Sequence, residues 1–442
     1  MTQRTTRRDF FRGAGWSAAA VAAAMGLDRR RGYGAAEDAE AGHEARYWEK
    51  LEDGALQCTL CPHACKIDDG KAGKCRARAR RGDQIVSLVY GKAAVLTPEL
   101  IERHGLFHVH PGSGALTIGT AGCILSCRYC STYTVSQATP ASVQAEDLPP
   151  ERAIEMAEQM GCEGLVFSGN DPIVHLEYVI DTAKLAREAG LFTAAHTSAF
   201  VNPEPLKEMC GVIDAFNVDL KGFTETFYRS VTGGKLAVVQ AAIQTIREQD
   251  VWLEITNLVV PGQNDSTTYV KRMCEWVLKT CGPDIPVHFS AFFPRYQFPA
   301  PGYSATKADV LRDLRKEAYK VGIRYAYVGN VPTEMPGQTT FCPRCLQAMI
   351  QRLGNAVQNR AFNYKARRCA SCNNEIPGVW QTGVVKPMPP PPPPPEPEKK
   401  EEKPAAPATK PATTTPAKQE QPAAPTTTPP AKKEQPAPAT KP

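Results

Sequence analysis

Three cysteines within eight residues form the part of this sequence most able to do chemistry. Cys123, Cys127 and Cys130 have the spacing C-x3-C-x2-C, and they follow a short apolar stretch, residues 116–120, that has the character of a strand. A 4Fe-4S cluster is normally held by four thiolates, so three thiolates in one loop leave one iron open to a further ligand. A zinc knuckle or a set of unrelated thiols is the alternative interpretation.

At this loop the chain resembles the radical S-adenosylmethionine (radical SAM) superfamily. The resemblance implies that the open iron binds the amino and carboxylate groups of SAM. It also implies that the reduced cluster cleaves SAM to a 5'-deoxyadenosyl radical, which abstracts hydrogen from a substrate. An electron donor of the flavodoxin or ferredoxin type is then expected as a partner.

A second set of cysteines lies near the end of the folded part, with the spacing C-x2-C-x23-C-x2-C. Its members are Cys342, Cys345, Cys369 and Cys372. Each C-x2-C pair can place two thiolates on one tetrahedral ion, and two pairs complete the closed site of a zinc ribbon. We therefore expect structural zinc here, with rubredoxin-like iron as the main alternative.

A third set, with the spacing C-x2-C-x3-C-x9-C, lies near the N-terminus. It consists of Cys58, Cys61, Cys65 and Cys75. This set is compatible with zinc, with His63 able to replace one thiolate, with an auxiliary 4Fe-4S cluster, or with unligated thiols. The remaining four cysteines are scattered and are expected to be small buried side chains. They are Cys162, Cys210, Cys274 and Cys281.

The elements that must position these groups alternate between strands and helices. Seven apolar runs have strand character, at residues 116–120, 165–168, 192–195, 215–219, 252–259, 287–291 and 325–328. Helical periodicity predicts six helices, at residues 152–160, 176–189, 205–210, 236–249, 267–280 and 307–321. This alternation predicts an α/β fold with a parallel sheet, one strand short of a full barrel.

Polar residues follow several of these strands, where barrel enzymes place their chemistry. They include Asn170 with Asp171, Asp219 with Lys221, and His288 within the sixth strand. A carboxylate near the open iron can accept the SAM ammonium, and a lysine can offset the SAM carboxylate. A helix cap or a solvated loop charge is the alternative role for each of them.

Over residues 47–380 the chain resembles the radical SAM protein of the AmmeMemoRadiSam system, a relative of pyruvate formate-lyase activating enzymes. The resemblance rests on Cys58-Thr59-Leu60-Cys61-Pro62-His63, Ser87-Leu88-Val89-Tyr90-Gly91-Lys92, the cysteine loop, Asp219-Leu220-Lys221, Val260-Pro261-Gly262, His288-Phe289-Ser290, Tyr327-Val328-Gly329-Asn330-Val331-Pro332 and Ile376-Pro377-Gly378-Val379-Trp380. It implies a partial (β/α)6-type TIM barrel with small cysteine-rich metal-binding elements on both sides.

The same resemblance implies SAM contacts. Tyr129 would lie beside the adenine, Asp171 would meet the SAM amino group, and Asp219 and Lys221 would also contact SAM. The chain departs from the family at residues 169–173, where Gly-Asn-Asp-Pro-Ile stands in place of Tyr-Asn-Glu-Pro-Thr, and at residues 131–133, where Ser-Thr-Tyr replaces Gln-Asn-Trp. These departures bear on the choice of substrate, for which a protein partner is one candidate.

The two ends of the chain differ from its body. Residues 1–36 resemble a twin-arginine export leader, with Arg7 and Arg8 before a weakly apolar run. Residues 386–442 are rich in Pro, Ala, Thr and Lys, contain no aromatic residue and cannot form a core. We expect export to the periplasm or anchoring at the membrane, with leader and tail as tethers. Cytoplasmic location is the alternative.

Charge excludes one class of partner. The formal net charge is +6, of which residues 1–31 contribute +5 and residues 386–442 contribute +3, so the body carries −2. A near-neutral body has no electrostatic footprint for nucleic acid. No run of 18 or more apolar residues in the body suggests a transmembrane span.

The sequence as a whole predicts a radical SAM enzyme with an N-terminal cysteine-rich segment at 44–110, a barrel at 111–331 and a ribbon at 332–385. Its expected cofactors are a 4Fe-4S cluster, SAM and zinc. The alternative is an exported iron-sulfur protein without SAM chemistry, serving in electron transfer or assembly.

Overall fold

The computed structural model describes residues 42–331 and 336–381. The expectations about the leader at 1–36 and the tail at 386–442 therefore lie outside the described residues. The predicted ribbon segment spans residues 332–385, and its two ends, 332–335 and 382–385, also lie outside the described residues.

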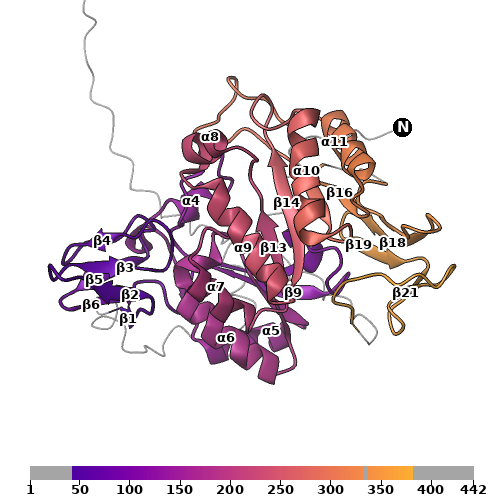
Figure 1. The fold of residues 1–442 in the computed structure, drawn as a ribbon. Coiled ribbons are helices and arrows are strands. Elements are labelled where there is room, and N and C mark those ends of the chain that lie inside the picture. Colours follow the sequence, from indigo (N-terminus) through magenta and orange to yellow (C-terminus); the bar gives the residue numbers. More distant parts are fainter. Residues whose placement is uncertain (1–41, 332–335, 382–442) are drawn as a thin grey trace, which may run out of the picture. The chain divides into compact units, whose positions relative to one another are not determined.

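An eight-stranded sheet carries the fold, in the order β16-β15-β14-β13-β12-β11-β9-β8 (Figure 1). Its strands are β8 (Val95–Leu100), β9 (Gly114–Gly119), β11 (Gly164–Phe167), β12 (Phe192–Thr197), β13 (Ala215–Asp219), β14 (Trp252–Val259), β15 (Val287–Ala291) and β16 (Ala326–Gly329). The seven strands from β9 to β16 are parallel to their neighbours, and β8 pairs with β9 in the antiparallel direction.

One main helix connects each parallel strand to the next. These helices are α5 (Pro150–Gln159), α6 (Leu176–Glu188), α7 (Pro203–Cys210), α9 (Leu236–Glu248), α10 (Thr267–Cys281) and α11 (Ala308–Val321). Shorter turns are η1 (Ile101–His104), α4 (Tyr133–Ser136), η2 (Pro140–Ser142), η3 (Pro172–His175), α8 (Glu225–Phe227) and η4 (Tyr228–Thr232). The result is six β/α units and a seventh parallel strand.

The local sequence explains these elements. In α9 the buried side chains include Leu236, Val239, Ile243 and Ile246, spaced three or four residues apart, so that one helix face packs on the sheet. In β11 four consecutive residues are buried, as expected for a parallel strand covered on both faces. The seven strands and six helices predicted from these patterns are confirmed, with their ends shifted by a few residues.

The structure changes one predicted boundary. The sequence assigns residues 95–110 to the N-terminal cysteine-rich segment, but β8 is a strand of the main sheet, and the Asn217 amide in β13 donates to the Gly105 carbonyl at 2.7 Å. The reason that β8 escaped detection is Pro98 within it. Proline weakens a strand prediction, yet it is tolerated in an edge strand such as this one.

The N-terminal elements form two small sheets. One contains β1 (His43–Glu44), β6 (Gln84–Ser87) and β5 (Arg78–Arg81), and the other contains β2 (Trp48–Lys50), β3 (Leu56–Cys58) and β4 (Lys66–Ile67). A further pair joins β7 (Lys92–Ala93) to β10 (Glu146–Asp147). An ion pair of 2.8 Å between Arg78 and Glu177, each 1% exposed, fixes this segment to α6.

The C-terminal elements are β17 (Thr340–Phe341), β18 (Ala348–Leu353) and β19 (Ala356–Asn359) in one sheet, with β20 (Phe362–Asn363) and β21 (Arg368–Cys369) as a hairpin. Arg352 links them to residues before β9, because its guanidinium donates to Glu102 at 3.3 Å and to the Phe107 carbonyl at 2.6 Å. Among the described helices, none is long and apolar enough to cross a membrane.

Candidate active site and metal centres

The loop with the cysteine triad leaves the end of β9 and is largely enclosed by protein. Cys127 is buried, and Cys123 and Cys130 are half-buried. Burial raises the pKa of the Cys127 thiol to about 12, and burial also raises the pKa of Cys123. Metal ligands must be thiolates, so any metal centre at this loop forms with the release of protons.

Neighbouring backbone holds the loop in shape. The N–H of Ser126 donates to the carbonyl of Thr232 at 2.9 Å, and the N–H of Arg128 donates to Val231 at 2.9 Å. Gly122 has a φ of 88°, and a Cβ added there would stand 2.3 Å from the carbonyl oxygen of Cys75. Only glycine allows this close approach between the triad loop and the N-terminal cysteine segment.

Asn170, predicted to contact SAM, uses both groups of its amide on the backbone near the triad. Its Nδ2 donates to the carbonyl of Gly122 at 2.8 Å, and its Oδ1 accepts from the N–H of Thr120 at 3.1 Å. The side chain thereby ties the end of β11 to the start of the triad loop. The structure gives it a positioning role.

Asp171, predicted to receive the SAM ammonium, is 4% exposed and has four protein donors. One carboxylate oxygen accepts from the N–H of Ile173 at 3.2 Å and from the hydroxyl of Thr197 at 2.9 Å. The other accepts from the N–H of Ser198 at 2.9 Å and from the Ser198 hydroxyl. Its negative charge helps to raise the pKa of Cys123, after the effect of burial, which places it beside the triad.

Asp219 and Lys221 follow β13 and form an ion pair with an Nζ to Oδ2 distance of 2.7 Å. The other oxygen of Asp219 lies 3.1 Å from Nε2 of His196, at the end of β12. Burial opposes ionisation of Asp219, but Lys221 and His196 outweigh it and hold the pKa well below its ordinary value. Burial raises the pKa of Cys127, and the Lys221 charge opposes this rise, as expected for an ammonium in the neighbourhood of the triad.

Tyr129 lies within the triad loop and is 4% exposed. Its ring packs near Phe227, Phe292 and Phe298, at centroid distances of 6.4, 6.5 and 6.2 Å. Its hydroxyl is buried and has no hydrogen-bond partner among the described residues. Burial raises the pKa of Tyr129 well above its ordinary value, so the phenol is neutral.

His288 lies elsewhere than predicted. Its Nε2 is 2.7 Å from the buried Glu254 carboxylate, which also accepts from the N–H groups of Phe107 and His108. These two residues precede β9, whereas the triad follows it. The buried pair therefore faces the opposite end of the strand from the triad, and the structure gives His288 no part in the predicted SAM site.

The C-terminal quartet comes together as predicted. The sulfurs of Cys342, Cys345, Cys369 and Cys372 all lie within 4.8 Å of one another. Cys342 and Cys372 are 3.5 Å apart, and Cys345 and Cys369 are 3.7 Å apart. With Zn–S bonds of about 2.3 Å, a tetrahedral ion holds its sulfurs about 4 Å apart. The quartet can therefore hold one metal ion.

The four cysteines of the N-terminal quartet are also brought together by the fold, around a shared pocket. They line it together with His63, Arg78 and apolar side chains that include Ile124 of the triad loop. The ring of His63 does not face an open ligand position through Nε2, because this atom is 2.7 Å from the carbonyl of Ile124.

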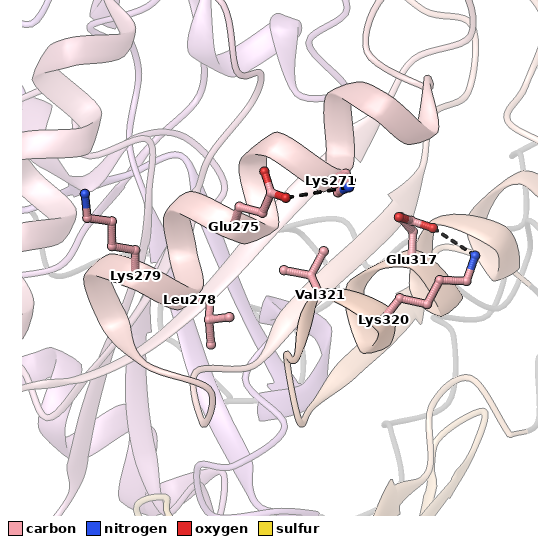
Figure 2. A pocket seen from close by; sticks show the side chains of 7 residues that line it. All are labelled: Lys271, Glu275, Leu278, Lys279, Glu317, Lys320 and Val321. Atoms are coloured by element: carbon pink, nitrogen blue, oxygen red, sulfur yellow. Dashed lines mark hydrogen bonds and ion pairs between the residues drawn. The ribbon is translucent and has the colours of Figure 1, made fainter.

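A separate groove lies between α10 and α11, on the outer layer of helices. Figure 2 shows Lys271 beside Glu275 and Lys320 beside Glu317, at 3.8 and 3.1 Å. Leu278, Lys279 and Val321 complete its lining. Four of its charged side chains, Lys271, Glu275, Glu317 and Lys320, are paired along their own helices, and the residues predicted for cofactor binding do not line the groove.

The sequence places His196, Thr197 and Ser198 at the end of a predicted strand without assigning them a role, and it does not single out Glu254. His196 and the Thr197–Ser198 pair end β12 and hold Asp219 and Asp171, and Glu254 begins the buried network near Phe107. The position of His196, Thr197 and Ser198 at a strand end was a usable signal. Glu254 gave none, because a single glutamate within a strand does not reveal which residues it contacts in space.

This chain matches one protein family and several known proteins in sequence. The radical SAM superfamily matches residues 117–272. The uncharacterized protein MJ0808 of Methanocaldococcus jannaschii is 32% identical over 333 residues, which cover 75% of this chain and 98% of that protein.

Activating enzymes match over shorter lengths. Benzylsuccinate synthase activating enzyme of Thauera aromatica is 30% identical over 117 residues, and pyruvate formate-lyase-activating enzyme of Clostridium pasteurianum is 26% identical over 155 residues. These matches cover 26% and 34% of this chain, and the chain spans 35% and 64% of the two enzymes. A solved domain of a pyruvate-formate lyase-activating enzyme from Bacteroides vulgatus has 19% identity and a TM-score of 0.34, covering 38% of this chain and 99% of that chain.

Proposed function

The chain belongs to the radical SAM superfamily, and on this premise we propose that it is an enzyme that cleaves SAM reductively to act on a protein substrate. The observation that carries the proposal is the loop after β9, which presents Cys123, Cys127 and Cys130 inside the stretch that matches the superfamily. A 4Fe-4S cluster held by these thiolates supplies, when bound, the electron that splits SAM into methionine and a 5'-deoxyadenosyl radical.

The residues present fit such a cluster. Among the described Cys, His, Asp and Glu side chains, the four sulfurs of the C-terminal quartet all lie within 4.8 Å of one another. The three sulfurs of the triad do not. Thiolates that bind different irons of one cluster need not converge on one point, as the ligands of a single ion must. Lys221, whose side chain is 14% exposed, adds a positive charge near Cys127, which suits an anionic metal centre.

The polar residues beside the triad divide into two roles. We assign SAM binding to Lys221, whose ammonium is aimed by Asp219, and to Tyr129, whose ring can line the adenine. His196 fixes the free oxygen of Asp219 and so holds the pair in place. Asn170 and Asp171 act as positioning residues, because their polar atoms already bond to the ends of β9, β11 and β12.

The relatives support the class of substrate. Two of them are activating enzymes for benzylsuccinate synthase and pyruvate formate-lyase, so their names identify proteins as what they act on. The same chemistry requires a one-electron donor, for which a flavodoxin or ferredoxin is the expected partner. Structural zinc in the C-terminal quartet completes the proposed cofactors, supported by the close approach of its four sulfurs.

The proposal is tested by measuring 5'-deoxyadenosine after anaerobic reconstitution, reduction and addition of SAM. Wild type is expected to form it, and Cys127→Ala is expected to form none. Cys210→Ala is the matched control, since Cys210 is as buried as Cys127 but lies on α7. If reconstituted wild type forms no 5'-deoxyadenosine and its reduced EPR signal ignores SAM, the proposal fails, and an iron-sulfur protein without SAM chemistry takes its place.

A further inference from the structure

The N-terminal cysteines surround a pocket that no part of the proposed function uses. Cys58 ends β3, Cys65 precedes β4, and Cys75 precedes β5, so three different elements bring the thiols together with Cys61. All four line the same pocket. Its apolar lining includes Leu60, Ile67 and Ile124, and three of the four cysteines are buried, whereas Cys65 is half-buried.

The spacing of the sulfurs distinguishes this set from the C-terminal quartet of the same chain. Within residues 42–331 and 336–381, the four sulfurs of the C-terminal quartet are the only set of three or more ligand atoms that all lie within 4.8 Å of one another. A single tetrahedral zinc needs that compact arrangement. The N-terminal set lacks it, although its cysteines share one pocket.

The triad provides a second comparison within the chain. It also lacks the compact arrangement, and it is the loop to which we assign a multi-iron cluster. Thiolates of a 4Fe-4S cluster bind four different irons at the corners of a cube, so their sulfurs stand farther apart than around one ion. Like the triad, the N-terminal quartet lacks the compact arrangement of a single-ion site, and unlike the triad it offers a full set of four thiols.

Arg78 provides an independent observation. It lines the pocket, is 1% exposed, and donates from NH1 to Glu177 at 2.8 Å and from NH2 to the carbonyl of Arg46. Its Nε–H is buried and has no partner among the described residues. A buried donor without an acceptor is uncommon, and a bound acceptor in the pocket would satisfy it. A cluster with four thiolates is an anion whose sulfur atoms accept such a bond, and the guanidinium offsets its charge.

The pocket adjoins the triad loop. Ile124, which directly follows Cys123, forms part of the pocket wall. The His63 ring, on the turn between Cys61 and Cys65, is bonded to the Ile124 carbonyl at 2.7 Å, and the Cys75 carbonyl closes on Gly122. A metal centre in the pocket would therefore be separated from the triad by the backbone of one loop.

From these observations we propose that Cys58, Cys61, Cys65 and Cys75 hold a second 4Fe-4S cluster, fully ligated by the protein and adjacent to the cluster of the triad. Four thiolates leave no iron open, so this centre does not bind SAM. Arg78 donates through Nε to the sulfur atoms of the centre.

Metal and sulfide analysis of anaerobically reconstituted full-length protein tests the proposal. Labile sulfide is the deciding readout, because neither zinc nor a rubredoxin-type iron contributes any. Two 4Fe-4S clusters give about eight irons and eight sulfides per chain. We also expect the triple variant Cys123→Ala, Cys127→Ala, Cys130→Ala to keep about four sulfides and a 4Fe-4S absorbance. A variant with Cys162, Cys210 and Cys274 changed to Ala controls for loss of buried thiols and keeps all the sulfide.

Wild type with about four sulfides and about two zincs would overturn the proposal, as would a folded triad variant without sulfide. If the triad variant does not fold, the wild-type count decides alone. The outcome is separable from that of the proposed function. Wild type that forms 5'-deoxyadenosine but carries only four sulfides refutes the second cluster alone. Eight sulfides without any SAM response refute the SAM chemistry alone.

Discussion

Replacement of Asp171 by asparagine tests whether this carboxylate holds the neighbouring strand ends in place or binds SAM directly. The substitution keeps the size of the side chain and turns one carboxylate oxygen into an NH2 group. In the structure each oxygen accepts one backbone N–H and one hydroxyl, from Ile173 and Thr197 on one side and from Ser198 on the other. A carboxylate has about four acceptor sites. All of them are used, so little capacity remains for an ammonium.

The magnitude follows from this geometry. A hydroxyl can rotate to accept from the new NH2, but a backbone N–H cannot, so one of the two buried N–H groups loses its acceptor in either orientation of the amide. An unsatisfied buried donor costs about 1–3 kcal/mol, and the remaining bonds lose their charge assistance. We expect Asp171→Asn to reduce the free energy of unfolding by about 2–4 kcal/mol.

Thermal unfolding of the reconstituted protein, followed by circular dichroism under anaerobic conditions, measures the effect. At about 2 °C per kcal/mol for a chain of this size, the midpoint should fall by roughly 4–8 °C. Ser198→Ala should lower it less, and Asp250→Asn, at an exposed turn, should leave it unchanged. SAM affinity should change by less than about threefold, below the 1.4 kcal/mol that corresponds to tenfold. An unchanged unfolding midpoint together with tenfold weaker SAM binding would refute the positioning role of Asp171.

Three further predictions concern the remaining parts of the chain. Cys345→Ser removes one of four thiolates from the C-terminal quartet, so limited proteolysis should cut residues 341–380 while the 4Fe-4S absorbance persists, because metal binding and local folding are linked there. Glu177→Gln leaves the buried Arg78 charge unpaired and should lower stability by about 3–5 kcal/mol, seen as loss of soluble protein, whereas Glu155→Gln in an exposed pair should change little. Replacing Arg7 and Arg8 by lysine should retain the protein in the cytoplasm of its host, and equal fractionation of wild type and variant would show that the leader is no export signal.

Much of the fold could be predicted from local patterns. The buried run in β11 and the regular spacing of apolar residues in α9 are properties of neighbouring residues in the chain, and these follow from how strands and helices bury one face or stripe. The antiparallel strand β8 could not be predicted in the same way. Its proline is acceptable only at the edge of the sheet, and a strand becomes an edge through its neighbours in space.

The site shows the same division. The placement of Asp219 and Lys221 at one strand end could be predicted from sequence, because successive parallel strands end on one side of the sheet. The partners of Asp171 could not, since Thr197 and Ser198 lie on another strand. His288 sits in a strand that was predicted correctly, yet it pairs with Glu254 against the segment that precedes β9.

The three sets of cysteines differ in what the sequence and the tertiary structure each determine about them. The sequence by itself determined which cysteines group together, because a knuckle or a cluster loop draws its thiols from one short turn of chain, as Cys123, Cys127 and Cys130 do. Only the tertiary structure decided how far apart the sulfurs of each set stand and what surrounds them. That distance depends on how separate elements pack, and it distinguishes a site whose four sulfurs can meet one ion from a pocket whose four thiols do not converge on a single point.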